Sequence, residues 1–241
     1  MSNFTKRLIK KQGIKNKKIF VIYPTLEEIS SSPKYLKIEK YFTLLSVGRL
    51  IKRKGQDLVI KSLINLKKII PELKYEIVGN GPEEIRLKNL VKGYNLEKIV
   101  NFNGEVNKKE LNRIYSNCNI FVLPTKFIKP NDIEGFGIVF IEANSFSKPV
   151  IGGKTGGVAE AIENGKSGFL INPNSKKELY DKIIQLYKNR KLLKKIGNYG
   201  KKRVINKFYR KKNKKFVKFL NEVYKIKKNL ISKKSFQTSI I

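Results

Sequence analysis

The 241-residue sequence contains no histidine and only one cysteine. Without histidine, the chain lacks the side chain that most often serves as a general base near neutral pH and as a metal ligand. A single cysteine, Cys118, excludes an internal disulfide framework and is typical of proteins from a reducing cytoplasm. We expect Cys118 to be a small buried residue at a helix end rather than a nucleophile.

Long apolar runs are also missing. No stretch approaches the roughly 18 apolar residues that a membrane-spanning helix needs, and no signal peptide is recognisable at the N-terminus. We therefore expect a cytoplasmic protein. Hydrophobic residues nevertheless make up 40% of the chain, which is enough to form a buried core and excludes a disordered chain.

Acidic residues are scarce beside basic ones: 19 Asp and Glu stand against 53 Lys and Arg, giving a formal net charge of +34. Such a charge is typical either of a face that binds nucleic acid or an anionic membrane, or of a solvated surface built from lysine. Only eight of the 53 basic residues are arginine. Because nucleic-acid binders use arginine forks and interleaved aromatic residues, we favour the second interpretation and do not expect nucleic acid as a partner.

Apolar segments of strand type alternate with amphipathic segments of helix type along most of the chain. The expected strands span residues 18–23, 41–47, 74–78, 99–102, 120–123, 149–152 and 168–171. The expected helices span residues 4–11, 55–70, 108–117 and 208–228, with others ending near Lys92, running through Glu142, starting after Gly157 and lying in the lysine-rich C-terminal part. This alternation predicts an α/β fold with a doubly wound, Rossmann-like parallel sheet.

The loop over residues 48–55 is the first candidate for ligand binding. In a doubly wound sheet, ligands bind at the carboxyl ends of the strands, and this glycine-bounded loop follows the strand at 41–47 with four cations. Arg49 and Lys54 are candidates for neutralising a diphosphate. Taken alone, such residues are more often ordinary surface charge than ligands.

Two carboxylates flank the start of the central helix. Glu134 precedes the turn Gly135-Phe136-Gly137, and Glu142 follows within the helix. Glycines that open a helix leave free backbone N–H groups at its positive end, which suits a phosphate. Glu142 is a candidate acceptor for both hydroxyls of a ribose, since a carboxylate accepts through two oxygens. Solvated helix charges are the alternative, but placement on one edge with the cations favours a phosphorylated ligand that carries hydroxyls.

Three further residues at this edge fit two interpretations each. Gly79 and Gly81 fit a simple turn or a ligand loop, and Glu160 fits a favourable charge at a helix N-terminus or a ligand-binding carboxylate. Neither the nicotinamide fingerprint Gly-x-Gly-x-x-Gly nor a Walker loop is present, so a nicotinamide-dependent enzyme is disfavoured.

Six motifs, in this order, resemble those of glycosyltransferase family 4. They are Gly48-Arg49-x4-Lys54-Gly55, Val78-Gly79-x-Gly81-Pro82, Phe121-Val-Leu-Pro124, Glu134-Gly-Phe-Gly-x4-Glu142-Ala143, Lys148-Pro149-Val150 and Gly156-Gly157-x-x-Glu160. The resemblance covers residues 41–175 and, more loosely, the flanks. It implies the C-terminal, donor-binding half of a GT-B architecture. The implied enzyme transfers a hexose with retention of configuration and without a metal or other cofactor.

The same resemblance implies substrates. The donor is a nucleotide-diphosphate sugar, either GDP-mannose or a UDP-sugar, and the acceptor is a saccharide or a lipid-linked molecule. The reaction belongs to the synthesis of cell-envelope polysaccharide or glycolipid. A lipid-linked acceptor is compatible with peripheral contact between the protein and the anionic inner face of the membrane.

By this resemblance, the catalytic residues are Glu134, Arg49 and Lys54. Arg49 and Lys54 hold the donor diphosphate and stabilise the leaving nucleotide, and Glu134 binds hydroxyls of the transferred sugar. The remaining donor-binding positions are Gly48, the backbone N–H groups of Phe136, Gly137 and Ile138, and Glu142, which binds the ribose. In the family view, the acceptor attacks the face from which the nucleotide leaves, and the diphosphate helps to take the acceptor proton.

The chain departs from the family in its length. Members have two domains and about twice the mass, with an N-terminal acceptor-binding domain that often supplies a histidine near the reacting sugar. Residues 1–40 resemble only the last helix and strand of that domain and a linker, and residues 41–205 resemble the donor-binding domain. Residues 206–241 contain a C-terminal helix that would pack on the missing domain, with a tail. Ser147 stands where relatives usually have glycine, a mild change at a helix end.

The leading hypothesis is the donor-binding half of a glycosyltransferase that requires a companion N-terminal domain or subunit. An inactive or split-subunit fragment is one alternative. Another is a basic nucleic-acid or membrane-surface binding protein that reuses the fold, for which the lysine clusters at 10–18, 201–202 and 211–218 are the motivation.

Overall fold

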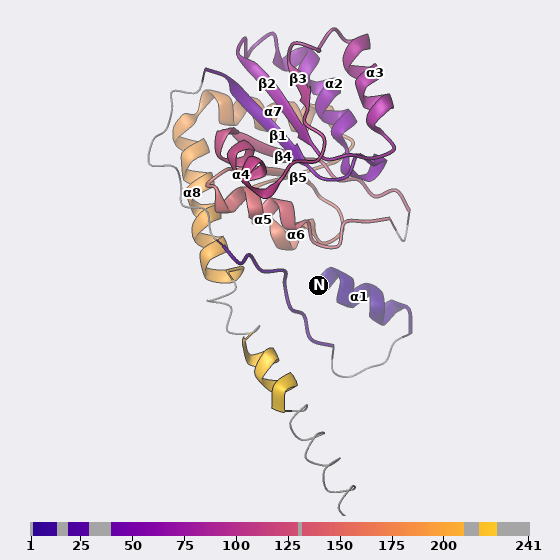
Figure 1. Ribbon diagram of the computed structural model, residues 1–241, viewed down its shortest axis with the longest axis vertical. Helices are drawn as coiled ribbons and strands as arrows, with labels where there is room; N and C mark the ends of the chain where they lie inside the picture. The colour runs from indigo at the N-terminus through magenta and orange to yellow at the C-terminus, as the bar shows by residue number, and fades with distance from the viewer. Residues whose placement is uncertain (1, 14–18, 29–39, 130–131, 210–216, 226–241) are drawn as a thin grey trace, which may run out of the picture.

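A single parallel sheet forms the centre of the protein. The computed structural model describes residues 2–13, 19–28, 40–129, 132–209 and 217–225. Six strands pair in the order β3-β2-β1-β4-β5-β6, every neighbouring pair being parallel (Figure 1). They are β1 (Phe42–Val47), β2 (Leu73–Val78), β3 (Val100–Phe102), β4 (Ile120–Leu123), β5 (Val150–Gly153) and β6 (Gly168–Ile171). This order is that of a doubly wound sheet, which confirms the predicted fold class.

Strand side chains alternate between two hydrophobic cores, one on each face of the sheet. In β1, Phe42 and Leu44 belong to the first core, whereas Leu45 and Val47 belong to the second. The residues of β4 divide between the cores in the same way. Because both faces are covered, the central strands are apolar at nearly every position.

Helices cover both faces. The first core receives buried residues from α2 (Gln56–Leu66), α3 (Glu84–Gly93) and α7 (Lys176–Lys188). The second receives them from α4 (Lys108–Asn117), α5 (Ile138–Ser145) and α6 (Val158–Ala161). The long helix α8 (Arg190–Lys207) contributes Ile196 to the first core and Val204 to the second. Among the described helices, none combines the length and the hydropathy needed to cross a membrane.

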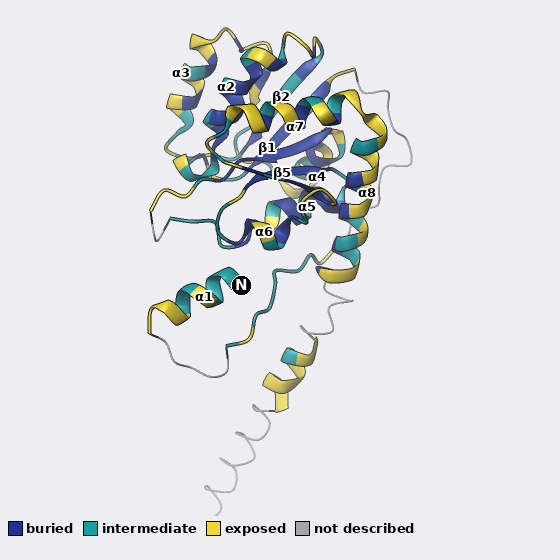
Figure 2. Ribbon diagram, turned by 180° about the vertical axis from the view of Figure 1, so that it is seen from behind, coloured by how far each residue is buried: buried dark blue, intermediate teal, exposed yellow. Residues whose placement is uncertain are grey.

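The N-terminal helix α1 (Asn3–Lys11) lies apart from the sheet. Figure 1 shows it beyond α5 and α6, followed by a segment that returns toward the end of α8. None of the residues within α1 is buried, so the helix is teal and yellow in Figure 2 while the sheet is dark blue. The α/β body therefore contains the hydrophobic core. The helix α1 is held against this body by contacts other than burial of its own residues in that core.

Two predicted elements differ from the structure. The strand expected at 18–23 is not formed over residues 19–23, the part that the structure describes. A strand needs a neighbour for its backbone groups, and the described sheet has no strand beside this segment. The predicted helix over 208–228 is wrong at its start: α8 ends at Lys207, and Tyr209 forms a bridge with Leu26. Residues 217–225 are helical, and the remainder of the predicted helix after Tyr209 lies outside the described residues.

The backbone conformation at Ser147 gives a physical reason for expecting glycine at this position. Ser147 follows the end of α5 with φ 59°, the left-handed conformation that glycine adopts most easily. Serine therefore occupies a position whose backbone conformation favours glycine, the residue that the resemblance leads us to expect there.

Candidate functional site

The central strands β1 and β4 place their following loops side by side. From β1 the chain moves outward to β2 and β3, and from β4 it moves outward to β5 and β6 in the opposite direction. The carboxyl ends of such a strand pair leave a crevice, which is where doubly wound proteins bind ligands. The loop over 48–55 and the loop leading to Glu134 both start at this point.

A cluster of four charged side chains, which we call the charge cluster, joins these two loops: Arg53, Lys54, Asp132 and Glu134. Oε2 of Glu134 accepts from Arg53 Nη1 at 2.6 Å and from Lys54 Nζ at 2.7 Å. Arg53 Nε donates to Asp132 Oδ1 at 2.8 Å. Burial alone would raise the pKa of the Glu134 carboxyl, but Lys54 and Arg53 hold that pKa below its ordinary value. Glu134 is therefore an ionised carboxylate at neutral pH.

The backbone of the cationic loop explains why Arg53 and Lys54 point to Glu134. Residues Lys52–Lys54 form a single 3-10 turn that ends at Gly55, which has φ 74°. A Cβ atom at Gly55 would lie 2.3 Å from the carbonyl oxygen of Pro124, so only glycine permits this contact between the loops. The N–H of Lys126 also donates to the Arg53 carbonyl at 2.7 Å. The two loops are thus fixed against one another.

The glycine turn after Glu134 opens α5 with free donors. Gly137 precedes the first helical residue with φ 82°. Within the described residues, the N–H groups of Phe136, Gly137 and Ile138 donate to no acceptor. The Phe136 side chain is buried against the rings of Tyr23 and Phe208, with centroids 5.6 Å away in each case. The predicted anion seat therefore has its backbone donors available and its side chain fixed in the core.

Glu142 lies in different surroundings from Glu134. It lines a cavity of about 810 Å³ together with Ile138, residues of α4 and residues 25–28. Its Oε2 accepts a 3.0 Å hydrogen bond from the hydroxyl of Tyr115. Burial raises the pKa of the Glu142 carboxyl, although the Tyr115 hydrogen bond acts in the opposite direction. Glu134 thus lies among cations, whereas Glu142 lies in a cavity beside a tyrosine hydroxyl. Such a difference is what we expect if the two carboxylates bind different parts of a ligand.

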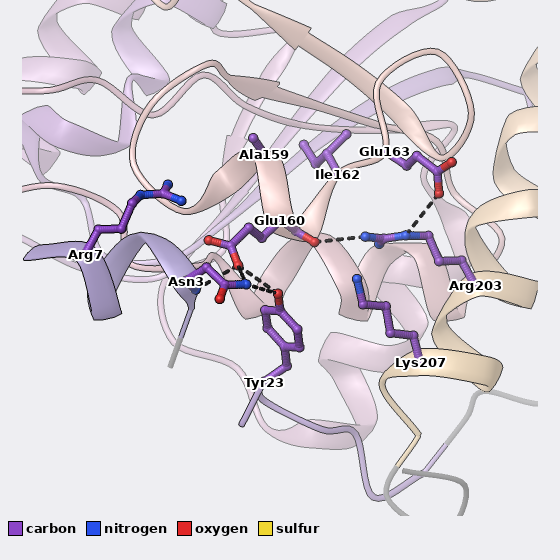
Figure 3. Close-up of a pocket in the computed structure, with 9 residues that line it drawn as sticks. All are labelled: Asn3, Arg7, Tyr23, Ala159, Glu160, Ile162, Glu163, Arg203 and Lys207. Carbon is purple, nitrogen blue, oxygen red and sulfur yellow. Dashed lines mark hydrogen bonds and ion pairs between the residues drawn. The ribbon is translucent and has the colours of Figure 1, made fainter. Parts of the chain in front are cut away.

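Glu160 has a role that the sequence did not reveal. Its carboxylate accepts from the backbone N–H groups of Asn3 at 2.8 Å and Phe4 at 2.7 Å, and from the Tyr23 hydroxyl at 2.8 Å. Figure 3 shows Asn3 and Tyr23 beside Glu160 at the side of a cavity of about 570 Å³. The pKa of Glu160 is lowered: burial raises it, but the Asn3 and Phe4 donors outweigh that effect. Glu160 joins α1 to the body of the protein.

The structure brings some predicted residues together and leaves others apart. Lys54 and Glu134 are in contact, with Gly48 under the Lys54 side chain, whose Cε would lie 3.6 Å from a Cβ at that position. The Arg49 side chain is exposed and bonds to no described residue. Gly79, with φ 116°, lies against the loop after β1: a Cβ there would lie 2.5 Å from the Gly48 carbonyl oxygen.

Three residues were not identified from the sequence: Arg53, Asp132 and Tyr115. Of these three, Arg53 alone could have been found from the sequence, because it stands in the predicted cationic loop beside Lys54. Asp132 and Tyr115 have no local pattern that sets them apart. Their partners, Arg53 and Glu142, are 79 and 27 residues away in the sequence.

Comparison with known proteins places this geometry among sugar-transferring enzymes. The sequence matches the family described as "Glycosyl transferases group 1" over residues 27–203. It is 30% identical over 160 residues to the GDP-mannose-dependent alpha-(1-6)-phosphatidylinositol monomannoside mannosyltransferase of Mycobacterium tuberculosis. That alignment covers 66% of this chain and 42% of the relative. The chain therefore spans less than half the length of this relative.

Solved structures give the same result. A glycosyltransferase from Rickettsia africae ESF-5 is 26% identical with a TM-score of 0.77, over 95% of this chain and 62% of that chain. A mutant of S. aureus TarM, in complex with Fondaparinux, alpha-GlcNAc-glycerol and UDP, is 25% identical with a TM-score of 0.75. The match covers 90% of this chain and 42% of that chain. All four members of the charge cluster lie within the region that matches the family.

Proposed function

The chain belongs to the glycosyl transferases of group 1, and from this membership we propose that residues 41–205 bind a nucleotide-diphosphate sugar as the donor of a glycosyl transfer. The observation that carries the proposal is the charge cluster, in which Glu134 meets Lys54 beside the free N–H groups that open α5. The name of the mycobacterial relative specifies GDP-mannose, and the TarM complex contains UDP. GDP-mannose and UDP-sugars are therefore the two donor classes to test.

In this proposal each predicted residue has a distinct task. The diphosphate lies over the N-terminus of α5 and takes Arg49 and Lys54 as its cations. The sugar hydroxyls bind Glu134, whose low pKa keeps it an acceptor. The ribose hydroxyls bind Glu142, whose side chain already accepts from a hydroxyl, that of Tyr115.

The proposed chemistry is hexosyl transfer with retention. The bond between the anomeric carbon and the diphosphate oxygen breaks, the acceptor oxygen bonds to that carbon on the same face, and the acceptor proton passes to the diphosphate. Arg49 and Lys54 stabilise the negative charge that develops on the leaving diphosphate. No metal ion is assigned a role, because these cations meet that need.

The acceptor, a saccharide or a lipid-linked molecule of the cell envelope, requires a second surface. We assign residues 1–40 and 206–241 to contact with a companion acceptor domain or subunit. Phe20 is 64% exposed, and Leu220 and Val223 of helix 217–225 are each 44% exposed. Residues 19–22 and helix 217–225 also line one shared groove of about 350 Å³. We expect the isolated chain to bind the donor with little transfer, and a lipid-linked acceptor to bring the assembled enzyme to the anionic membrane surface.

Calorimetry with UDP and GDP tests the donor site. One of the two nucleotides is expected to bind wild-type protein at micromolar to millimolar concentration, and Glu142→Ala is expected to weaken that binding. Exposed Glu105, outside the site, provides the matched control Glu105→Ala. Absence of binding by both nucleotides at millimolar concentration would contradict the proposal. Binding of RNA or anionic vesicles with a steep salt dependence that survives Glu142→Ala would instead support a basic surface binder.

A further inference from the structure

Arg53 lies at the centre of the charge cluster, although the proposed donor site assigns it no task. Its Nε donates to Asp132 at 2.8 Å and its Nη1 donates to Glu134 at 2.6 Å. Its side chain is 17% exposed, in contrast to the exposed side chain of Arg49. A planar guanidinium in this position fixes two carboxylates relative to each other, which the ammonium group of Lys54 cannot do.

Both ends of this bridge are held by other contacts. On one side, the Arg53 carbonyl accepts from the N–H of Lys126, and Lys126 Nζ pairs with Asp57 at 2.9 Å. On the other side, the N–H of Asp132 donates to the Lys129 carbonyl at 2.9 Å. Arg53 is thus fixed at its backbone and at Nε, so its guanidinium has little freedom to turn away.

The two cations share one oxygen of Glu134. Arg53 and Lys54 both donate to Oε2, and Oε1 accepts from none of the residues that the structure describes. A hydroxyl of a bound ligand therefore has one carboxylate oxygen available while the other stays charge-paired. The pairing also fixes the orientation of the Glu134 carboxylate.

We propose that Arg53 is a positioning residue that keeps Glu134 ionised and oriented toward the sugar while Lys54 serves the diphosphate. This inference rests on the proposed donor site. An incoming diphosphate competes with Glu134 for Lys54, because both are anions within reach of one ammonium. Because Asp132 holds the Nε of Arg53, Arg53 stays beside Glu134 when the diphosphate binds. Glu134 therefore stays paired with the Arg53 guanidinium, whether Lys54 pairs with Glu134 or with the diphosphate.

Matched titrations separate this role from simple phosphate binding. Wild type, Arg53→Gln and Arg53→Lys are titrated with GDP and GDP-mannose, and with UDP and UDP-N-acetylglucosamine. For the pair that wild type binds, Arg53→Gln is expected to weaken the sugar nucleotide about tenfold while the affinity for the free diphosphate changes less than about threefold. Arg53→Lys, which retains the charge, is expected to restore part of the loss. Equal loss for both ligands would make Arg53 a phosphate ligand and overturn the inference.

Arg86→Gln is the matched control, because the Arg86 side chain is 48% exposed and pairs with Glu83, the residue before α3. Its affinity for both ligands is expected to equal that of wild type. Asp132→Asn, which alters the partner of Arg53, is expected to weaken sugar-nucleotide binding in the same direction by a smaller factor. Unchanged binding in both Arg53 variants would also overturn the inference.

A second measurement needs no ligand. Carbon-13 NMR of side-chain carboxyls, assigned with Glu134→Gln, follows the titration of Glu134 in the free protein. In Arg53→Gln the pKa of Glu134 is expected to rise, and in Arg86→Gln it is expected to stay at the wild-type value. An unchanged pKa in Arg53→Gln refutes the inference even if wild type binds nucleotide. Failure of wild type to bind any nucleotide refutes the donor site instead, so the two failures are distinguishable. If Arg53→Gln does not fold, Asp132→Asn takes its place in the titrations: sugar-nucleotide binding is expected to weaken more than diphosphate binding, and equal affinities to wild type for both ligands would overturn the inference.

Discussion

Removal of the Glu160 carboxylate is expected to release α1 while the α/β body stays folded. The N-terminal N–H groups of a helix have no partner within the helix. In α1, the groups of Asn3 and Phe4 donate to Glu160, and that of Thr5 donates to the Ser2 hydroxyl. Glu160 also accepts from Asn3 Nδ2 at 3.0 Å and from Tyr23. One carboxylate therefore completes the cap of α1 and ties it to the body.

The size of the effect follows from these contacts. A helix cap contributes about 1 kcal/mol, and hydrogen bonds to a charged group contribute somewhat more. Glu160 is only partly buried, so screening by solvent reduces the sum to about 2 kcal/mol. Glu160→Ala should then lower the hydrogen-exchange protection of α1 amides by a factor of about 10 to 30.

Hydrogen exchange read by mass spectrometry provides the assay. Peptides from α1 should exchange faster in Glu160→Ala, whereas peptides from β1 and β4 should not change. Glu163→Gln is the control, because Glu163 pairs with Lys166 and Arg203 and not with α1. Equal protection of α1 in wild type and Glu160→Ala would refute the role given to Glu160.

The same contact predicts a dependence on pH. Because the folded state lowers the pKa of Glu160, its contribution is fully present above the ordinary range of a glutamate pKa. It is lost as the pH falls through the lowered value. Protection of α1 should therefore be constant from neutral pH down to that range and should decrease below it.

Three further predictions concern the site and its support. Because the pKa of Glu142 is raised, donor affinity measured by calorimetry should fall on acidification before an ordinary glutamate would be protonated, and Glu142→Gln should remove that dependence. Ser147→Gly should raise the free energy of unfolding, measured with urea, by about 1 kcal/mol, because the φ of 59° suits glycine; an unchanged value would show that serine carries no strain there. Phe208→Ala should lower the free energy of unfolding by about 3–5 kcal/mol, because the Phe208 ring is fully buried between Tyr23 and Phe136. A loss under about 1 kcal/mol would contradict the packing described.

The regular part of the fold was predictable because its signals are local. The strands β4 and β6 and the helix α4 have the expected bounds, since apolar runs and a 3.6-residue period need no distant partner to be recognised. Residues 19–23 show the limit of such signals. They are as apolar as a strand, but pairing depends on a neighbour, and the described sheet supplies none beside them.

The residues of the candidate site could be predicted from the sequence better than the contacts that they make. The cationic loop contains Arg49, Lys52, Arg53 and Lys54, and the sequence led us to expect Arg49 and Lys54 at the ligand. The 3-10 turn and the left-handed Gly55 decide that Arg53 and Lys54 face Glu134 while Arg49 stays exposed. The partner of Glu160 was still harder to foresee, because Asn3 is 157 residues away and lies on a separate helix.

The location of the bound diphosphate tests the central claim most directly. Nitrogen-15 NMR of the wild-type chain, titrated with UDP and GDP, reports each backbone amide separately. The account predicts that the largest shifts occur at the N–H groups of Phe136, Gly137 and Ile138, with further changes in the loop over 48–55. Binding that shifts only amides of the lysine-rich helices α7 and α8, leaving the start of α5 unchanged, would contradict it.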